Sequence, residues 1–213
     1  MKTIKVRITT TEEMLGTAPN DKEIYATFIG SKSPDASTIE DEVESLGVEE
    51  VVEQKKTIFP KLEDGTPFIW DYQIRGFFKD ACGMLSRITT TVVDEKTGKS
   101  KKKKGGSESG KISAYKKVID GLIFVSPRKI PIKFDGEITD CQRPLRASTP
   151  QGERIALANS EAIPAGAVIE FDIQLLSEEY EPAVIEWLEY GVFRGLGQWR
   201  NSGKGRFAYE ILE

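Results

Sequence analysis

Glycine and cationic side chains gather in one short segment near the end of the sequence, Gly195 to Arg206. Its four glycines are Gly195, Gly197, Gly203 and Gly205. Its cations, counting the residue just before it, are Arg194, Arg200, Lys204 and Arg206, with no acid among them. Glycines allow positive φ and close approach of another backbone, and Trp199 offers a flat face for stacking. Close approach, phosphate neutralisation and base stacking together favour binding of a single-stranded nucleic acid.

The order of elements around this segment excludes two familiar nucleotide sites. In a dinucleotide-binding turn the glycines follow a strand and begin a helix. Here they follow an expected helix and precede an expected strand, and the sequence contains no G-x₄-G-K-[ST] motif. An ordinary glycine-rich turn after a helix remains the alternative interpretation.

A second basic segment lies in the middle of the sequence. Residues 96–117 contain nine lysines and one acid, a local charge of +8 in a chain whose total is −4. Four of these lysines are consecutive: Lys101, Lys102, Lys103 and Lys104. Residues 40–53 hold seven acids and no base. The lysine block predicts either a phosphate-binding surface or a solvated, mobile loop, so the total charge says little about partners.

The residue types available exclude several chemistries. The sequence has no histidine and two cysteines, Cys82 and Cys141, which excludes histidine-based catalysis and a Cys₄ metal site within one chain. Carboxylate pairs such as Glu178/Glu179 are typical of solvated surface. We therefore expect no catalytic residue, no metal and no cofactor. With no apolar run near ~18 residues and no apolar N-terminal stretch, we expect a cytoplasmic protein with no membrane partner.

Periodicity predicts the elements that would position these segments. Residues 2–10 alternate as an amphipathic strand, and an apolar stripe from Ile74 to Leu85 predicts a helix capped by Asp71. Pro182 begins a second helix that ends near Gly191, and residues 37–54 could form another. Further strands are expected at 88–93, 121–125, 130–134 (an edge strand, because of Pro131), 154–158, 167–176 and 207–212. This order predicts an α+β fold with an antiparallel sheet.

Three segments resemble the RAMP superfamily of CRISPR-associated proteins, especially the backbone subunits of class 1 effector complexes. The Gly195–Arg206 segment is similar to the family's C-terminal glycine-rich loop. Residues 64–79 resemble its P-x-I-x-G-S-S-L-K-G-x-x-R pattern, with Trp-Asp-Tyr in place of Gly-Ser-Ser. Residues 143–176 resemble a third family segment, in which a loop with Arg143 and Arg146 leads to a Pro-Ala-Gly turn before an inner strand.

The resemblance implies a ferredoxin-like (RRM-related) core in a single domain, 1–213, with insertions at about 11–64 and about 94–130. It implies binding of an RNA backbone, with guide RNA as the expected ligand, and partners that are other effector subunits or copies of itself. The implied RNA contacts are Arg75 and Lys79, the lysine run Lys101–Lys104, and the glycine-rich segment with Arg194. Some family members cleave RNA with a loop aspartate, and Asp21 and Asp35 are the residues in the corresponding region.

Three hypotheses follow for function. The first is a non-catalytic RNA-binding subunit of a CRISPR effector, or a stand-alone or virus-borne relative that mimics one. The second is a structural or assembly protein, for instance of a virion, whose acidic segment 40–53 meets the basic segment 96–117 of another copy. The third is a metal-dependent nuclease that uses carboxylates alone.

Overall fold

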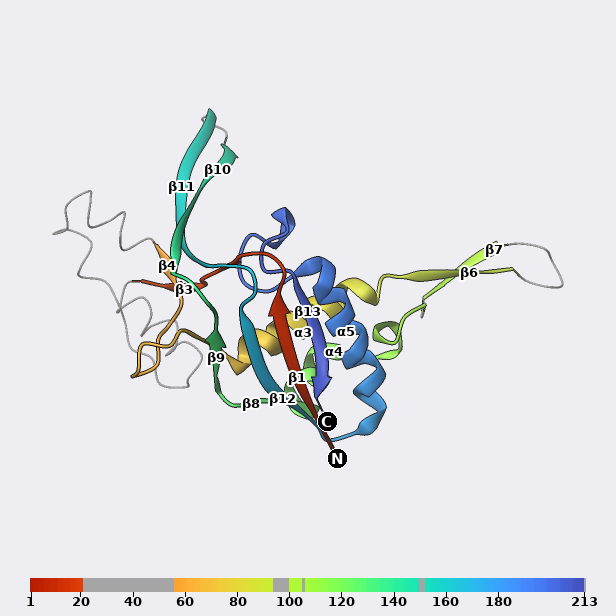
Figure 1. Ribbon diagram of the computed structural model, residues 1–213. Helices are drawn as coiled ribbons and strands as arrows, with labels where there is room; N and C mark the ends of the chain where they lie inside the picture. The colour runs from red at the N-terminus through yellow and green to blue at the C-terminus, as the bar shows by residue number, and fades with distance from the viewer. Residues whose placement is uncertain (21–55, 94–99, 105, 150–151, 213) are drawn as a thin grey trace, which may run out of the picture.

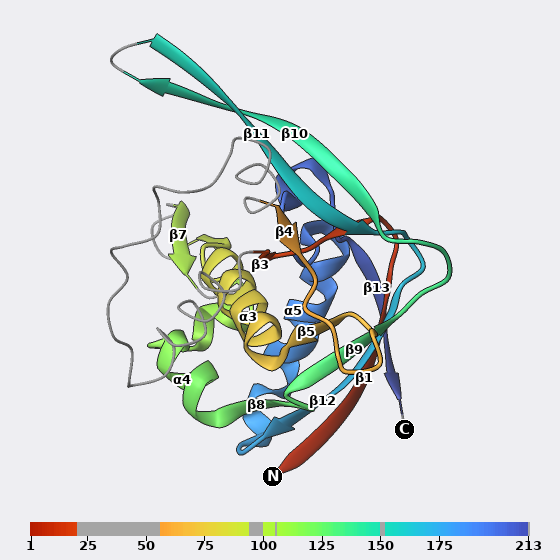
Figure 2. The ribbon, with the colours of Figure 1, turned by 90° about the vertical axis from the view of Figure 1, so that its left-hand side faces the viewer.

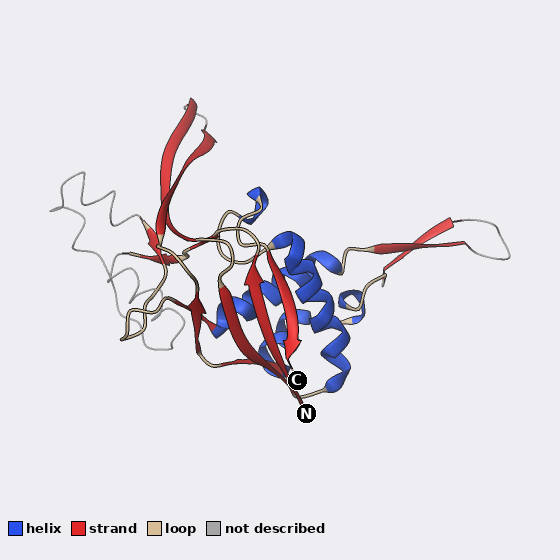
Figure 3. Cartoon of the chain, viewed as in Figure 1, coloured by secondary structure: helices blue, strands red, loops and turns tan. Residues whose placement is uncertain are grey.

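The chain folds as a mixed α+β protein. The computed structural model describes residues 1–20, 56–93, 100–104, 106–149 and 152–212. In this part of the chain, two larger β-sheets and a separate two-stranded hairpin accompany three α-helices (Figures 1 and 3). The helices are α3 (Asp71–Leu85), α4 (Tyr115–Leu122) and α5 (Glu181–Arg194). The predicted fold class is therefore confirmed at this level.

The larger sheet forms the centre of the molecule. Its strand order is β13-β1-β12-β9-β5, with β8 also paired to β12, and every pairing is antiparallel. The strands are β1 (Lys2–Thr10), β5 (Phe68–Trp70), β8 (Ile123–Ser126), β9 (Lys129–Lys133), β12 (Val168–Leu175) and β13 (Phe207–Leu212). Strands β1 and β13, the first and last in chain order among the described residues, thus lie side by side, and β13 is at the edge of this sheet.

The period-two pattern of β1 positions the core as predicted. Ile4, Val6 and Ile8 are buried, and they pair in register with Ile173, Phe171 and Ile169 of β12, which are buried as well. Because side chains alternate across a strand, all six apolar side chains share the face of the sheet toward the helices.

Helices α3 and α5 cover one face of the central sheet (Figures 1 and 2). The predicted stripe of α3 is confirmed, since Ile74, Phe77, Phe78 and Ala81 are buried. The predicted cap is wrong by one residue: Trp70 is the N-cap, and its backbone N–H donates to the Gln73 side chain at 2.7 Å. Glutamine at the third helical position can satisfy this donor, whereas Asp71 already lies inside the helix.

Helix α5 continues past Gly191, where the sequence predicts its end, to Arg194. Gly191 is buried, and a Cβ there would overlap the ring of Phe207 on β13. This glycine therefore makes room for an aromatic ring against the helix instead of ending the helix.

A second sheet carries a long hairpin that projects from the molecule (Figure 2). Strands β10 (Thr139–Thr149) and β11 (Gly152–Ile163) form the hairpin, and the short strands β2 (Met14–Leu15), β3 (Ala18–Pro19) and β4 (Thr57–Ile58) complete the sheet. The expected loop around Arg143 and Arg146 is therefore wrong. Pro144 is tolerated because β10 is an edge strand.

Strand β9 lies between β12 and β5, so the prediction of an edge strand there is also wrong. Its pairing with β5 involves residues 129–131, whereas its pairing with β12 involves residues 132 and 133. At Pro131 the strand is therefore paired on the β5 side alone, and a residue without an N–H fits at that point.

The lysine run lies on a hairpin that extends away from the body of the molecule (Figure 1). Residues Lys101–Lys104 belong to β7 (Ser100–Lys104), which pairs with β6 (Thr89–Val93). At the base of this hairpin, the buried hydroxyl of Ser109 donates to Glu186 at 2.6 Å and accepts from the indole of Trp187 at 2.9 Å. Residues 115–122, within the range expected to be an insertion, form α4.

Several expectations concern residues outside the described part of the chain. These are the possible helix at 37–54, the acidic segment 40–53, Asp21, Asp35 and residues 94–99 of the basic segment. Among the described residues, no helix combines the length and the apolar character needed to cross a membrane.

The packing between α3 and α5 predicts a large effect of one core substitution. Phe78 and Trp187 are fully buried, with ring centroids 5.3 Å apart. We expect Phe78→Ala to lower the free energy of unfolding by about 3–5 kcal/mol, measured by urea denaturation. The matched control is Phe193→Ala, because Phe193 is 73% exposed, and it should change stability by no more than ~0.5 kcal/mol. Equal effects of the two variants would contradict this account of the core.

Candidate nucleic-acid interface

The glycine loop, residues 195–206, connects α5 to β13 and depends on glycine at four positions. The φ angles are +76° at Gly195, +80° at Gly197, +90° at Gly203 and +70° at Gly205. These values lie in the left-handed region that side-chain-bearing residues rarely adopt.

The close approach that these glycines allow is to the chain itself. The N–H of Leu196 donates to the carbonyl of Gly205 at 2.8 Å, and the N–H of Gly205 donates to the carbonyl of Glu13 at 2.8 Å. A Cβ at Gly205 would overlap the carbonyl of Leu196, and one at Gly197 would lie 2.7 Å from the carbonyl oxygen of Leu15. The loop is therefore closed by backbone contacts and docked on the segment that follows β1.

Most cations of the loop are engaged by carboxylates. Asp80 of α3 accepts from both Arg194, at 3.1 Å, and Arg200, at 2.8 Å. Lys204 pairs with Glu13. The exception is Arg206, an exposed residue whose Nε donates to the backbone carbonyl of Phe193 at 3.0 Å. Three of the four predicted phosphate contacts in this segment thus hold the loop on the rest of the protein.

The two predicted contacts on the first helix are also paired. Arg75 lies 3.1 Å from Asp71 one turn earlier on α3, and Lys79 lies 2.5 Å from Asp120 of α4. Lys79 therefore ties α3 to α4. The lysine strand β7 lies on its separate hairpin, whereas the glycine loop lies at an end of the central sheet, so the structure does not gather all the predicted contacts into one patch (Figure 1).

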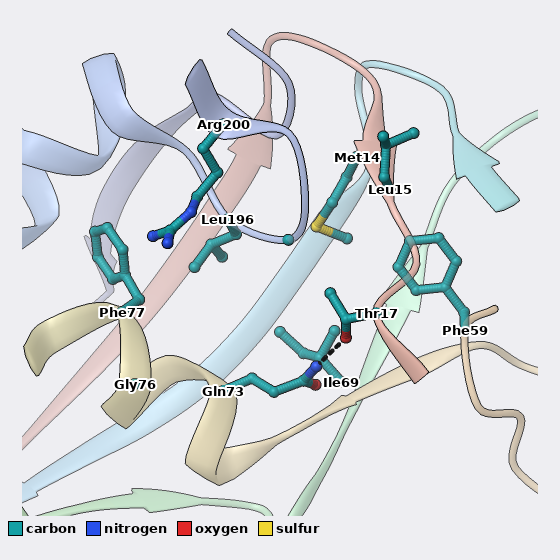
Figure 4. A pocket seen from close by; sticks show the side chains of 11 residues that line it. Met14, Leu15, Thr17, Phe59, Ile69, Gln73, Gly76, Phe77, Leu196 and Arg200 are labelled. Carbon is teal, nitrogen blue, oxygen red and sulfur yellow. Dashed lines mark hydrogen bonds between the residues drawn. The ribbon is translucent and has the colours of Figure 1, made fainter. Parts of the chain in front are cut away.

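A cavity of about 200 Å³ lies between the glycine loop and the start of α3 (Figure 4). Its walls are mainly apolar, and Gln73, which donates to the hydroxyl of Thr17, and Arg200 supply polar groups. The residues that line it are Met14, Leu15, Thr17, Phe59, Ile69, Gln73, Gly76, Phe77, Leu196, Gly197 and Arg200. The segment 64–79 thus faces the glycine loop across this cavity.

Arg143 joins the third segment to the same loop. From β10 its Nη2 donates to the side-chain oxygen of Gln198 at 2.7 Å, and its guanidinium lies 5.4 Å from the ring centroid of Trp199. The sequence singles out Arg143 only within the third segment and gives it no role. No local sequence signal marks Arg143 as buried, because its burial depends on the pairing of β10 with β11 and on contacts with the glycine loop.

Trp199 is the predicted stacking residue, and the structure leaves it accessible. Its side chain is 41% exposed, and its φ of +53° places a bulky residue in the left-handed region. Such a conformation is unusual for a residue with a large side chain and is maintained by the surrounding structure.

The titratable side chains of the described residues bear on metal binding and on nucleophilic reactivity. Within this part of the chain, no group of three or more Cys, Asp or Glu side chains is placed to hold a metal ion. Burial raises the pKa of the Cys82 thiol to about 11, so the reactive thiolate is scarce near neutral pH. On the exposed side of the central sheet, the hydrogen bond from Arg7 lowers the pKa of Glu170, which keeps that carboxylate charged.

No protein-family model and no curated protein matches the sequence. Solved structures do match. One is a chain in the cryo-EM structure of the Type III-B Cmr-β bound to cognate target RNA, with a TM-score of 0.49, 11% identity, and coverage of 99% of this chain and 60% of that chain. Another is a chain of a Type IV-B CRISPR complex, with a TM-score of 0.43, 12% identity, and coverage of 99% and 90%.

The protein thus spans 60% of the length of the first of these chains. Both matched chains come from CRISPR complexes. At these identities and TM-scores the matches assign no role to any residue of this chain.

The closed glycine loop predicts a strong effect of one added methyl group. We expect Gly205→Ala to lower the free energy of unfolding by at least about 1–3 kcal/mol, because the backbone must leave its positive φ and the methyl would overlap Leu196. The control is Gly76→Ala in the interior of α3, where no atom lies within 4 Å of an added Cβ. That variant should be neutral or gain up to ~1 kcal/mol. Thermal or urea unfolding measures both, and a neutral Gly205→Ala would contradict this account of the loop.

Proposed function

We propose that the protein is a non-catalytic RNA-binding subunit of a CRISPR effector ribonucleoprotein, or a stand-alone relative that mimics one. It binds the RNA backbone without strong sequence preference, and its other partners are effector subunits or further copies of itself. Guide RNA is the proposed ligand.

One observation carries this proposal: three segments that resemble the same family, and that are far apart in the sequence, meet around the glycine loop. Segment 64–79 meets the loop across the cavity and through the pairs of Asp80, just beyond it, with Arg194 and Arg200. Segment 143–176 meets the loop through the contacts of Arg143 with Gln198 and Trp199. Motifs that are matched only by chance have no physical reason to converge.

The proposed core is ferredoxin-like and lies in a single domain. In chain order, β1, α3, β8, β12, α5 and β13 alternate as strand, helix, two strands, helix and strand. Within the sheet, β13 flanks β1, β1 flanks β12, and β12 flanks β8. Two helices on one face of a four-stranded antiparallel arrangement of this order support the proposal, with the other strands as additions to it.

In this proposal the hairpin of β6 and β7, which carries Lys101–Lys104, supplies the long-range attraction for RNA. A chain with a net charge of −4 repels RNA as a whole, but a projecting strand with four consecutive lysines places cations well outside the acidic body. Electrostatic attraction of this kind needs no fixed contact and is screened by salt.

The proposal predicts a salt-dependent affinity for single-stranded RNA. We expect the dissociation constant for a fluorescein-labelled oligouridylate, measured by anisotropy, to rise steeply with salt. Replacing Lys101–Lys104 by Ala should weaken binding and flatten the slope of log K against log salt by up to ~0.7 per lost phosphate contact, about 3 in all.

The matched control removes the same charge elsewhere, at four exposed lysines: Lys5, Lys61, Lys129 and Lys133. It should lower affinity much less. Undetectable or salt-independent binding by the unmodified protein would overturn the proposal. Salt-sensitive oligomers in a preparation with no nucleic acid, judged by the 260/280 nm absorbance ratio, would favour the assembly hypothesis instead.

The proposal also predicts that bound RNA stays intact. End-labelled RNA incubated with the protein and Mg²⁺ should show the same length on a denaturing gel as RNA without protein. Cleavage that stops on addition of EDTA would support the carboxylate nuclease and would contradict the non-catalytic role.

A further inference from the structure

Arg143 is a buried cation for which the described part of the chain supplies no counterion. Only 8% of the residue is exposed, and its Nε and Nη1 atoms are inaccessible and have no hydrogen-bond partner. Its single hydrogen bond, from Nη2 to Gln198, is to a neutral amide. Among the described residues no carboxylate forms an ion pair with it. Buried guanidinium groups are normally satisfied, so these two donors are available to an acceptor from outside the described residues.

Neighbouring cations differ from Arg143 because they have carboxylate partners. Arg194 and Arg200 share Asp80, and Lys204 has Glu13, although all three are more exposed than Arg143. Carboxylates of the described residues thus pair with these three cations, but none pairs with the more buried Arg143. This position can therefore accept an anion from outside.

We infer that Arg143, Gln198 and Trp199 form a binding site for one phosphodiester of single-stranded RNA and the base next to it. Nη1 donates to a phosphate oxygen, Gln198 holds the guanidinium in orientation through Nη2, and the indole of Trp199 stacks on the base. This inference rests on the proposed function and deepens it, because it assigns the close contact to Arg143 in place of the carboxylate-paired Arg194, Arg200 and Lys204.

Trp199 is the part of the site that solvent reaches. Its indole lies 5.4 Å from the Arg143 guanidinium, and the residue is 41% exposed. Trp199 itself adopts the left-handed conformation, immediately before the short 3₁₀ turn Arg200–Ser202. An aromatic face and an amide beside a guanidinium donor suit a nucleotide better than the carboxylate of an acidic protein segment.

The test separates binding from stability. Arg143→Met keeps most of the side-chain length but removes the unsatisfied charge, so we expect the melting temperature without RNA to stay the same or rise. The same variant should bind the labelled oligouridylate at least about tenfold more weakly and reduce the salt slope by ~0.7. The control is Arg87→Met, the same change at an exposed position on the C-terminal side of α3, which should bind nearly as the unmodified protein does.

A second variant tests the stacking part. Asparagine tolerates the left-handed conformation, so Trp199→Asn should not lower the melting temperature but should weaken RNA binding about fivefold or more.

The outcomes distinguish failure of this inference from failure of the proposed function. If the unmodified protein binds RNA and Arg143→Met binds it as tightly as Arg87→Met, this inference fails while the proposed function stands. If the unmodified protein binds no RNA, the proposed function itself fails. A melting temperature lowered by several degrees in Arg143→Met would show a structural role and overturn the inference. Loss of self-association with unchanged RNA affinity would assign the site to an acidic segment of a second copy and overturn it as well.

Discussion

The backbone contact that closes the glycine loop determines where the other features of this site lie. The carbonyl of Gly205 accepts from Leu196, and Gly205 in turn donates to Glu13, at a point where an added side chain would overlap another backbone. Because the two ends of the loop are locked together, the residues between them project outward in a fixed arrangement. Arg200 reaches Asp80 on one side, and Gln198 and Trp199 reach Arg143 on the other.

The closed loop gives two of its cations, Arg194 and Arg200, a structural role. Exposed ion pairs add little stability each, but a carboxylate shared by two arginines fixes the orientation of a loop relative to a helix. Asp80 does this for Arg194 and Arg200, so charges that look available in the sequence are used to hold the loop. The local charge of a segment is therefore a poor guide to its capacity for RNA, since carboxylates distant in the sequence neutralise it.

The sequence predicts the elements of this fold better than it predicts the site. Alternation in β1 and the apolar stripe of α3 follow from local periodicity, and both are confirmed. The role of Gly191 could not be read locally, because it depends on Phe207 of another element. The same holds for Arg143: the family resemblance places it in a loop, and only the pairing of β10 with β11 shows that it lies on a strand. Ion pairs such as Lys79 with Asp120 depend on tertiary packing in the same way.

The two basic features invoked in the proposed function act over different distances. The lysine strand β7 lies on a projecting hairpin, where charge acts through solvent and is screened within about 10 Å at 0.1 M salt. Arg143 is buried, so its interaction with an anion is screened much less, but it operates only on direct contact. In the function proposed above, the hairpin therefore raises the rate of encounter, whereas Arg143 and Trp199 lengthen the lifetime of the complex. An acidic protein that binds RNA needs both a basic hairpin and a direct contact. Its net negative charge opposes the encounter with RNA, and it supplies no hydrogen bond that would hold the RNA once bound.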